Sequence, residues 1–385
     1  MNRKVAAMAK MMFVPKAKQD SRYYYIDNDL MQFPNCWCYC IYSPRGDGKT
    51  YSILDLLRRS GIMFIYMKRT NDDVRRLCAG SGAADGNKKE LTIDLSPFKP
   101  INRDKHTNIR CAAIDEGIAG FYDFEFDSDA QVWKPTGKPY GYVLSVNAIA
   151  KYKGFNLDEC DVLVYDEFIP MPWERVLKTE GKAILSLYDT LTRDRIERGL
   201  PEIKLIALAN ASDITNQLFD ILEIIDDVVM LEKNNKKFFH DSYRGILVHR
   251  ITEDEFPAKR KEKTGIQRAM ENTSFAAVEY EGQFAFNNLS IIKKEKLNGY
   301  KPVCSFKHRT KTFYVYRKSG DYYITDTRHD KKFKFYDLES EIEAVQFWGA
   351  YGFDLRVALF ENHCVCSSYT AYNVIFNFKK YYKVG

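Results

Sequence analysis

Ser43-Pro-Arg-Gly-Asp-Gly-Lys-Thr50 follows an apolar run, residues 36–42, and precedes a helix-like stretch, residues 51–59. This order predicts a strand, a phosphate-binding loop and a helix. In such a loop, backbone N–H groups face a polyphosphate at the helix N-terminus, the lysine reaches the β and γ oxygens, and the threonine hydroxyl ligates Mg²⁺. We expect a nucleoside triphosphate to be bound by Ser43, Pro44, Arg45, Gly46, Asp47, Gly48, Lys49 and Thr50. The usual motif begins with glycine where this chain has Ser43, so a surface turn is the competing interpretation.

A second motif lies at residues 161–168, where Asp-Val-Leu-Val-Tyr-Asp-Glu-Phe predicts a buried strand that ends in two acids. A Walker B motif requires this arrangement, with Asp166 holding Mg²⁺ and Glu167 orienting and deprotonating the attacking water. A protein that only binds nucleotide does not need the second acid. Alone, the run fits a solvated acidic turn equally well. Together with Lys49 it predicts hydrolysis of ATP in the presence of Mg²⁺.

The chain has 385 residues, of which 45% are hydrophobic, and this is enough for two packed domains of ordinary size. Its net charge of +6 permits a polyanionic partner without requiring one. Basic residues gather in the N-terminal arm, in residues 80–110 and in residues 293–311. The candidate nucleic-acid contacts in these stretches are Lys88, Lys89, Lys105, Lys307, Arg309 and Lys311. The competing interpretation is that these residues are ordinary surface charge.

The sequence predicts a cytosolic protein that does not contact a membrane. Lys10 interrupts the apolar N-terminal stretch, and no segment approaches a run of about 20 apolar residues. The nine cysteines lack the spacing of a structural zinc site, so we expect reduced thiols in the core.

Strand-like and helix-like runs alternate from residue 36 to about residue 250, which predicts a mostly parallel sheet flanked by helices. The expected strands there are residues 62–67, 140–146, 162–165, 203–209 and 228–231, and the expected helices are residues 70–77, 184–198 and 214–222. Later strands are expected at residues 303–308, 312–317 and 322–326, followed by helices at 339–351 and 369–382. The predicted domains are a basic arm (1–30), a nucleotide-binding domain (31–250), a connector (251–300) and a smaller α/β domain (301–385).

The chain resembles the DNA-encapsidation ATPases of small podophages that replicate by protein priming, which are related to large terminases. The matching stretches appear in family order at residues 45–50, 64–69, 164–169, 189–195, 208–211 and 323–330. The resemblance implies a P-loop NTPase fold of the additional-strand, catalytic-glutamate type, with a parallel sheet and helices on both faces. It also implies that the smaller domain is RNase H-like.

The resemblance also implies roles for residues outside the two nucleotide motifs. Arg193, with Arg195 as second choice, matches an arginine finger that acts on the neighbouring subunit, and Lys153 matches a second cation of that kind. Asn210 occupies the position of a γ-phosphate sensor, although capping the following helix is an equal alternative. Lys68 and Arg69 match basic residues that serve the nucleotide site, although surface charge would look the same.

The smaller domain departs from the nuclease pattern of terminases. Such nucleases place a carboxylate on the first strand so that two metal ions can be bound. Residues 303–308 offer no acid, and Asp326 alone, near Arg328, is a poor two-metal site. We therefore expect a degenerate nuclease domain that binds nucleic acid or the portal.

The expected function is that of an ATP-hydrolysing motor that translocates double-stranded viral DNA into a preformed procapsid. The resemblance implies a homo-oligomeric ring, usually a pentamer, at the portal vertex of the capsid in the host cytoplasm. The sequence leaves open whether a structural RNA adapter joins motor and portal. The alternatives are a terminase-like ATPase with an active nuclease and a non-hydrolysing, nucleotide-dependent scaffold.

Overall fold

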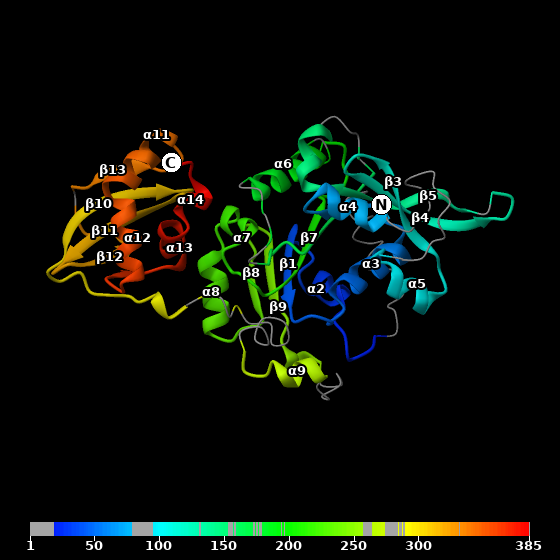
Figure 1. Ribbon diagram of the computed structural model, residues 1–385, viewed down its shortest axis with the longest axis horizontal. Helices are drawn as coiled ribbons and strands as arrows, with labels where there is room; N and C mark the ends of the chain where they lie inside the picture. The colour runs from blue at the N-terminus through cyan, green and yellow to red at the C-terminus, as the bar shows by residue number, and fades with distance from the viewer. Residues whose placement is uncertain are drawn as a thin grey trace. The chain divides into compact units, whose positions relative to one another are not determined.

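The structure is a computed structural model of the chain (Figure 1). It describes residues 19–78, 95–130, 132–152, 157, 159–171, 174, 176, 179–193, 195, 197–256, 264–273, 284, 287, 289–330 and 332–384. The chain forms two compact units. The first unit comprises Met1–Asp213 and Lys237–Ala285, and the second comprises Ile214–Lys236 and Phe286–Gly385.

A nine-stranded sheet forms the centre of the first unit, in the order β3-β4-β5-β2-β6-β7-β1-β9-β8. Its strands are β1 (Cys38–Ser43), β2 (Phe64–Lys68), β3 (Ile109–Asp115), β4 (Ile118–Asp127), β5 (Val132–Ser145), β6 (Val162–Asp166), β7 (Lys204–Asn210), β8 (Phe238–Asp241) and β9 (Ile246–Arg250). The six strands from β5 to β9 in this order are parallel, whereas β3, β4 and β8 add antiparallel pairs at the two ends. Strand β7 lies between β1 and β6, which is the additional strand that the fold prediction requires.

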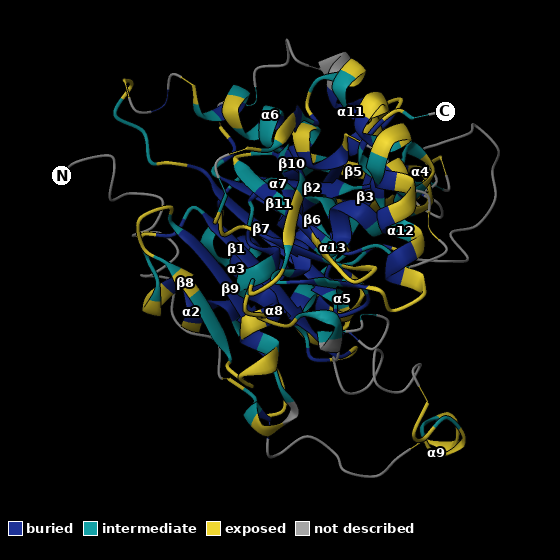
Figure 2. Cartoon of the chain, turned by 90° about the vertical axis from the view of Figure 1, so that its left-hand side faces the viewer, coloured by how far each residue is buried: buried dark blue, intermediate teal, exposed yellow. Residues whose placement is uncertain are grey.

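Helices cover both faces of this sheet. Alternate side chains of the central strands, such as Ile41 and Val164, pack into one core with α2 (Ile26–Gln32), α3 (Lys49–Ser60), α4 (Asn71–Cys78) and α5 (Lys99–Lys105). Tyr165, the next residue on β6, points to the opposite face and donates to Glu180, the first residue of α6 (Glu180–Thr192). Strands β1, β6 and β7 are almost completely buried (Figure 2). The predicted α/β P-loop fold is therefore confirmed.

The second unit is a smaller α/β structure. Its five strands, in the sheet order β13-β10-β11-β12-β14, are β10 (Lys301–His308), β11 (Lys311–Lys318), β12 (Asp321–Thr325), β13 (Lys334–Asp337) and β14 (Cys364–Cys366). Its helices include α7 (Gln217–Ile221), α8 (Ile225–Lys233), α11 (Glu341–Phe347), α12 (Phe353–Phe360), α13 (Tyr369–Phe376) and α14 (Phe378–Tyr381). The hairpin turn at Ser319 and Gly320 has positive φ at both residues, as a tight two-residue connection favours.

The strand expected at residues 228–231 and the helix expected at residues 184–198 are among the predicted elements that differ from the structure. Residues 228–231 form part of helix α8 and not a strand, because Ile225, Val228 and Val229 are buried at helical spacing. Asp226 in the first turn also suits the helix dipole. Helix α6 begins four residues earlier than residue 184 and ends at Thr192, so it does not extend to residue 198.

The structural units also depart from the predicted boundaries. Residues 214–236 group with the second unit although they precede β8 and β9 of the first. At the N-terminal end, residues 1–18 lie outside the described residues, whereas Tyr24, Ile26 and Leu30 are buried in the core of the first unit. Those residues belong to the packed sheet domain and not to a separate arm.

All nine cysteines are buried and free of disulfides. Within the described residues, no helix combines the length and the apolar character needed to cross a membrane.

Candidate active site

The phosphate-binding loop connects the end of β1 at Ser43 to the start of α3 at Lys49. Gly46 and Gly48 have φ values of +82° and +85°, a backbone region that side chains disfavour. A Cβ atom on Gly48 would also lie 3.3 Å from the Tyr23 Cβ. The glycines therefore allow the loop to turn back under Tyr23 and present the N-terminus of α3.

Lys49 is buried at the centre of the loop. Its Nζ donates to the Ser43 Oγ at 2.5 Å, to the Pro44 carbonyl at 3.1 Å and to the Asn210 Oδ1 at 3.3 Å. Ser43 thus supplies a hydroxyl to the lysine at the position where glycine is usual. Asn210 ends β7, so the additional strand carries the predicted sensor to the predicted phosphate-binding lysine.

Thr50 and Asp166 lie together although 116 residues separate them. The Thr50 Oγ1 donates to the Asp166 Oδ1 at 3.2 Å, and the other carboxylate oxygen accepts from the Tyr66 hydroxyl. Hydroxyl and carboxylate oxygens are the ligands that Mg²⁺ prefers. This donor set fits the metal site that the sequence predicts.

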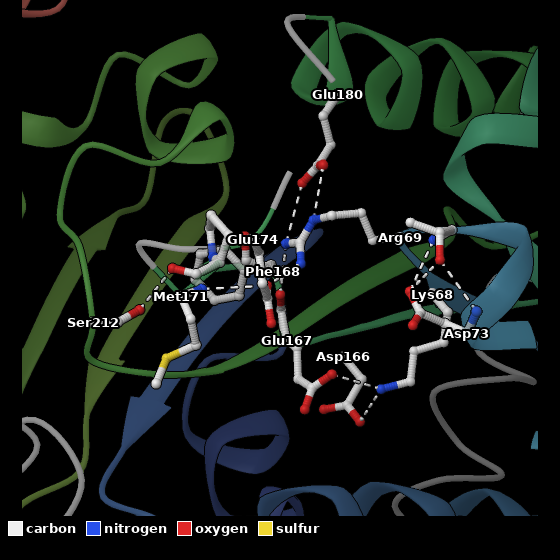
Figure 3. A network of polar contacts seen from close by, with 12 residues as sticks. Lys68, Arg69, Asp73, Asp166, Glu167, Phe168, Met171, Glu174, Glu180 and Ser212 are labelled. Carbon is white, nitrogen blue, oxygen red and sulfur yellow. Dashed lines mark hydrogen bonds and ion pairs between the residues drawn. The ribbon is translucent and has the colours of Figure 1, made fainter. Parts of the chain in front are cut away.

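Glu167 follows β6 directly, and 68% of its side chain is exposed. Its carboxylate accepts from the Lys68 Nζ at 2.9 Å, and the same ammonium lies 3.5 Å from Asp166 (Figure 3). Burial lowers the pKa of Lys68, but Asp166 and Glu167 outweigh it and raise that pKa above its usual value. Lys68 therefore remains a cation beside both acids, and its service to a nucleotide stays a prediction.

Arg69 points in a different direction from Lys68, as neighbouring residues at the end of a strand do (Figure 3). Its guanidinium donates to Glu180 at 3.0 Å, to Glu174 at 2.9 Å and to the backbone carbonyl of Glu167 at 2.9 Å. It bonds the backbone carbonyl of Glu167 and not the groups that contact Lys49. The predicted direct contact with nucleotide has no support in this geometry.

Arg193 and Arg195 have different surroundings. Arg193 follows the last residue of α6 with 70% of its side chain exposed, 3.9 Å from Asp189. Arg195 is 2% exposed, pairs with Asp161 and donates to the carbonyls of Pro201 and Cys160 at 2.9 and 3.2 Å. Arg193 is therefore open to solvent, whereas Arg195 supports the fold.

The remaining predicted residues fall into three groups. Lys88, Lys89 and Lys153 lie outside the described residues. Lys105 is exposed at the end of α5. In the second unit, each remaining candidate has an acidic partner: Lys307 with Asp337 at 3.2 Å, Arg309 with Asp220 at 2.9 Å and Lys311 with Asp226 at 3.2 Å. Nucleic-acid contact by these three residues stays a prediction, and it would require these ion pairs to open.

The end of β12 carries the acid that the sequence offers for a nuclease site. Asp326 follows this strand, is exposed and accepts from the hydroxyl of Thr327 at 3.3 Å. Across the described residues, no three His, Cys, Asp or Glu side chains gather closely enough to hold a metal ion.

A hollow of about 530 Å³ beside the phosphate-binding loop was not predicted from the sequence. Its lining includes Tyr23, which packs over Gly48, together with Tyr25, Phe238 and Phe256. These aromatic residues come from opposite ends of the first unit's sequence. Their proximity depends on the pairing of β1 with β9, which no local sequence pattern predicts.

A buried ionic network lies against the same hollow. The His249 Nδ1 is 2.7 Å from the Asp29 Oδ2, and its Nε2 is 3.3 Å from the Glu255 Oε2. The Tyr24 hydroxyl also donates to Asp29, at 2.7 Å. Burial lowers the pKa of His249, but the hydrogen bonds to Asp29 and Glu255 outweigh it and raise the pKa to about 9.

Comparison with known proteins identifies the family of this chain. No curated protein matches the sequence. Among solved structures, the Phi-28 gp11 DNA packaging motor matches with a TM-score of 0.59 and 15% identity, covering 95% of this chain and 99% of that one. The bacteriophage Phi-29 viral genome packaging motor assembly matches with a TM-score of 0.58 and 18% identity, covering 94% of this chain and 99% of that one. These likenesses establish a shared fold.

The sequence comparison goes further, because a family model matches more than half of the chain. The match covers residues 102–343 and includes the predicted Walker B motif, Asn210 and most of the second unit's sheet. The chain is a member of the Podovirus DNA encapsidation protein (Gp16) family.

Proposed function

We propose that this protein is an ATP-hydrolysing motor that moves double-stranded viral DNA into a preformed capsid. The observation that carries the proposal is the convergence of Lys49, Thr50, Asp166 and Glu167 at one edge of the sheet, in a member of a DNA encapsidation family. The packaging motors of similar fold named above support it.

The residues of the site divide the work of hydrolysis. The N–H groups of the loop and the Nζ of Lys49 bind the phosphates, and Thr50 and Asp166 hold Mg²⁺. The metal ion, when bound, neutralises charge on the phosphate oxygens. Glu167 orients the attacking water and accepts its proton, once its carboxylate is free of Lys68.

Asn210 connects the site to the rest of the first unit. Its side-chain oxygen lies 3.3 Å from the Lys49 Nζ, so a phosphate that recruits the lysine also changes the surroundings of the amide. Because Asn210 is the last residue of β7, this change reaches the chain that follows the strand. We assign Asn210 the role of reporting the state of the nucleotide.

The proposed assembly is a ring of subunits, a pentamer as the family resemblance implies, at the portal vertex of the procapsid in the host cytoplasm. In this ring Arg193 of one subunit enters the site of its neighbour and stabilises charge on the transferring phosphoryl group. Its exposure supports this role. Lys153 is kept as the second cation that acts on the neighbouring subunit, on the resemblance alone.

The aromatic hollow beside the loop is the proposed seat of the nucleobase. Tyr23 reaches both the hollow and Gly48, so a ligand with its phosphates on the loop can place an aromatic ring among these side chains. Tyr23→Ala should raise the KM for ATP about tenfold and leave kcat within about twofold, because it removes binding and no catalytic group. An unchanged KM would move the base elsewhere.

We propose that the second unit does not cut DNA and binds nucleic acid or the portal. Its first strand, β10, has no carboxylate, and Asp326 has no cluster of acids around it in the described part of the chain. A two-metal nuclease needs several such ligands.

Steady-state ATP hydrolysis by the purified protein tests the proposal. We expect Mg²⁺-dependent turnover that rises several-fold with double-stranded DNA. Lys49→Ala is the matched control, since it removes phosphate binding and leaves the second unit unchanged. A protein that binds ATP without hydrolysing it, with or without DNA, would instead be a nucleotide-dependent scaffold.

A further inference from the structure

Arg69 is a buried arginine, 7% exposed, whose donors spread over several elements of the first unit. Its Nε donates to the Glu180 Oε2 at 3.0 Å, its Nη1 to Glu174 at 2.9 Å and its Nη2 to the Glu167 carbonyl at 2.9 Å. The same Nη2 lies 3.5 Å from the Phe168 carbonyl. Figure 3 shows the guanidinium between α6 and the chain that leaves β6.

The backbone that Arg69 contacts has an unusual conformation. Glu167 has φ +60°, in the left-handed region that residues with a side chain seldom adopt. Such a conformation persists where neighbouring structure fixes it. Here the peptide after Glu167 is bonded on both sides, because its carbonyl accepts from Arg69 and its N–H, on Phe168, donates to the Leu208 carbonyl of β7 at 3.1 Å.

We propose that Arg69 is a positioning residue for the ATPase reaction: it fixes the left-handed backbone of Glu167, and this backbone aims the Glu167 carboxylate toward Asp166 and the nucleotide. The inference rests on the proposed function, since it assigns a positioning residue to the same site. It differs from the direct nucleotide contact that the sequence suggests for Arg69.

Glu180 supplies the fixed end of this arrangement. It is 2% exposed, begins α6 and accepts from both Arg69 and the Tyr165 hydroxyl, the latter at 2.5 Å. An arginine suits the position because its planar guanidinium donates in several fixed directions at once. A lysine at residue 69 would keep the charge, but a single ammonium cannot hold Glu180 and the Glu167 carbonyl in the same geometry.

Arg69→Lys tests the proposal in the full-length protein. We expect the affinity for a fluorescent ATP analogue and the KM for ATP to stay within about twofold of the parent, while kcat falls about tenfold to a hundredfold, because a misplaced general base slows only the chemical step. Glu180→Gln should lower kcat in the same way by a smaller factor. Hydrogen exchange in the peptide around Phe168 should accelerate in both variants, and this readout does not depend on activity.

Arg59→Lys is the matched control. Arg59 is also a mostly buried arginine on a carboxylate, 2.9 Å from Asp55, but it lies at the far end of α3. It should lose stability to a similar extent while kcat stays within about twofold and exchange near Phe168 is unchanged.

Three results would overturn the inference: a kcat of Arg69→Lys equal to that of Arg59→Lys, a loss of ATP affinity as large as the loss of kcat, or unchanged exchange near Phe168. The second would make Arg69 a nucleotide ligand after all. A parent protein without ATPase activity would instead reject the proposed function, so the two failures are distinguishable. Should Arg69→Lys fail to fold, Glu180→Gln and its exchange pattern decide the matter.

Discussion

The acids at the end of β6 show how neighbouring residues acquire separate tasks. Asp166 is half-buried and accepts from Thr50 and Tyr66, so its oxygens are fixed at the proposed metal site. Glu167 is largely exposed, and Lys68 holds its carboxylate. Asp166 is therefore held by partners from α3 and β2, whereas Glu167 has to leave Lys68 before it can act as the proposed base.

Single substitutions should separate binding from chemistry at this site. Glu167→Gln keeps the shape of the side chain but cannot accept a proton, so ATP affinity should remain within a few-fold while turnover falls about 100-fold or more. Lys49→Ala should lose ATP affinity. Equilibrium binding and steady-state hydrolysis measured on the same preparations check both expectations. Turnover at the parent rate in Glu167→Gln would remove this residue from the role of base.

His249 should make the stability of the first unit depend on pH. Its pKa in the folded protein is about 9, above the value of about 6.5 expected in the unfolded chain, so folding favours the protonated form. The stabilisation is complete below about pH 6.5 and is lost as the pH rises through 9. This stabilisation amounts to about 3 kcal/mol, and the hydrogen bonds of His249 to Asp29 and Glu255 are its cause.

Denaturant unfolding of the parent and of His249→Gln between pH 6 and 10 measures this term. The difference in unfolding free energy between the two proteins should shrink steadily above pH 6.5. A constant difference across this range would show that His249 does not titrate as its ionic surroundings require.

At the scale of elements, helix α6 connects a subunit's own candidate site to the arginine that we propose enters the site of its neighbour. Its first residue, Glu180, bonds Arg69 behind the Walker B acids, and Arg193 follows its last residue. The turn after the helix buries Arg195 against Asp161 and two carbonyls. One arginine of the pair therefore supports the fold, and the other remains available to a partner.

Alanine substitutions of the two arginines should have opposite consequences. Arg195→Ala leaves Asp161 without its buried cation and should cost about 3 kcal/mol of stability. Arg193→Ala should fold normally but hydrolyse ATP at least about tenfold more slowly. Mixing Arg193→Ala with Glu167→Gln subunits should restore activity, because some interfaces then combine an intact Glu167 with an intact Arg193. No recovery on mixing would contradict a finger supplied by the neighbouring subunit.

Some elements could be predicted from the sequence because their signal is local. Strands β6 and β7 are continuous apolar runs, as buried parallel strands are, and the glycine pattern fixes the start of α3. Helix α8 could not be distinguished locally, since Val228-Val-Met-Leu231 suits either a strand or a buried helix. The antiparallel strands β3 and β4 were missed because each is buried at one end and exposed at the other, which gives no regular alternation in the sequence.

The candidate site, like the fold, was predictable only where its signal is local in the sequence. The loop residues, Asp166, Glu167 and Asn210 meet because parallel strands end at one edge of a sheet. The role of Arg69 and the burial of Arg195 depend on Glu180 and Asp161, partners far along the chain that spacing does not reveal. Tertiary pairing, and not composition, decides whether a charged side chain is a ligand or part of the fold.

At the scale of the whole molecule, basic residues that the sequence suggests for nucleic acid form ion pairs within the second unit. Asp226 of α8 pairs with Lys311 and also accepts from the backbone N–H groups of Tyr369 and Thr370 at the start of α13. Buried Asp220 of α7 bonds both His308 and Arg309. The segment 214–236 is therefore an integral part of this unit, and experiments on residues 301–385 alone would lack it.

The full-length protein should not cleave DNA. Incubation with supercoiled plasmid and Mg²⁺ or Mn²⁺ should leave the plasmid intact, because β10 offers no carboxylate. Asp326→Ala is the control for contaminating nuclease. Metal-dependent nicking by the parent that disappears in Asp326→Ala would show an active nuclease and would make the protein a cleaving terminase.

A packaging assay tests the central claim most directly. It measures the amount of viral DNA that becomes resistant to nuclease inside portal-bearing procapsids. Parent protein with ATP and Mg²⁺ should protect DNA in proportion to the ATP hydrolysed, and Glu167→Gln, which still binds ATP, should protect none. Protection of DNA by Glu167→Gln at the parent level would contradict a motor driven by hydrolysis at this site.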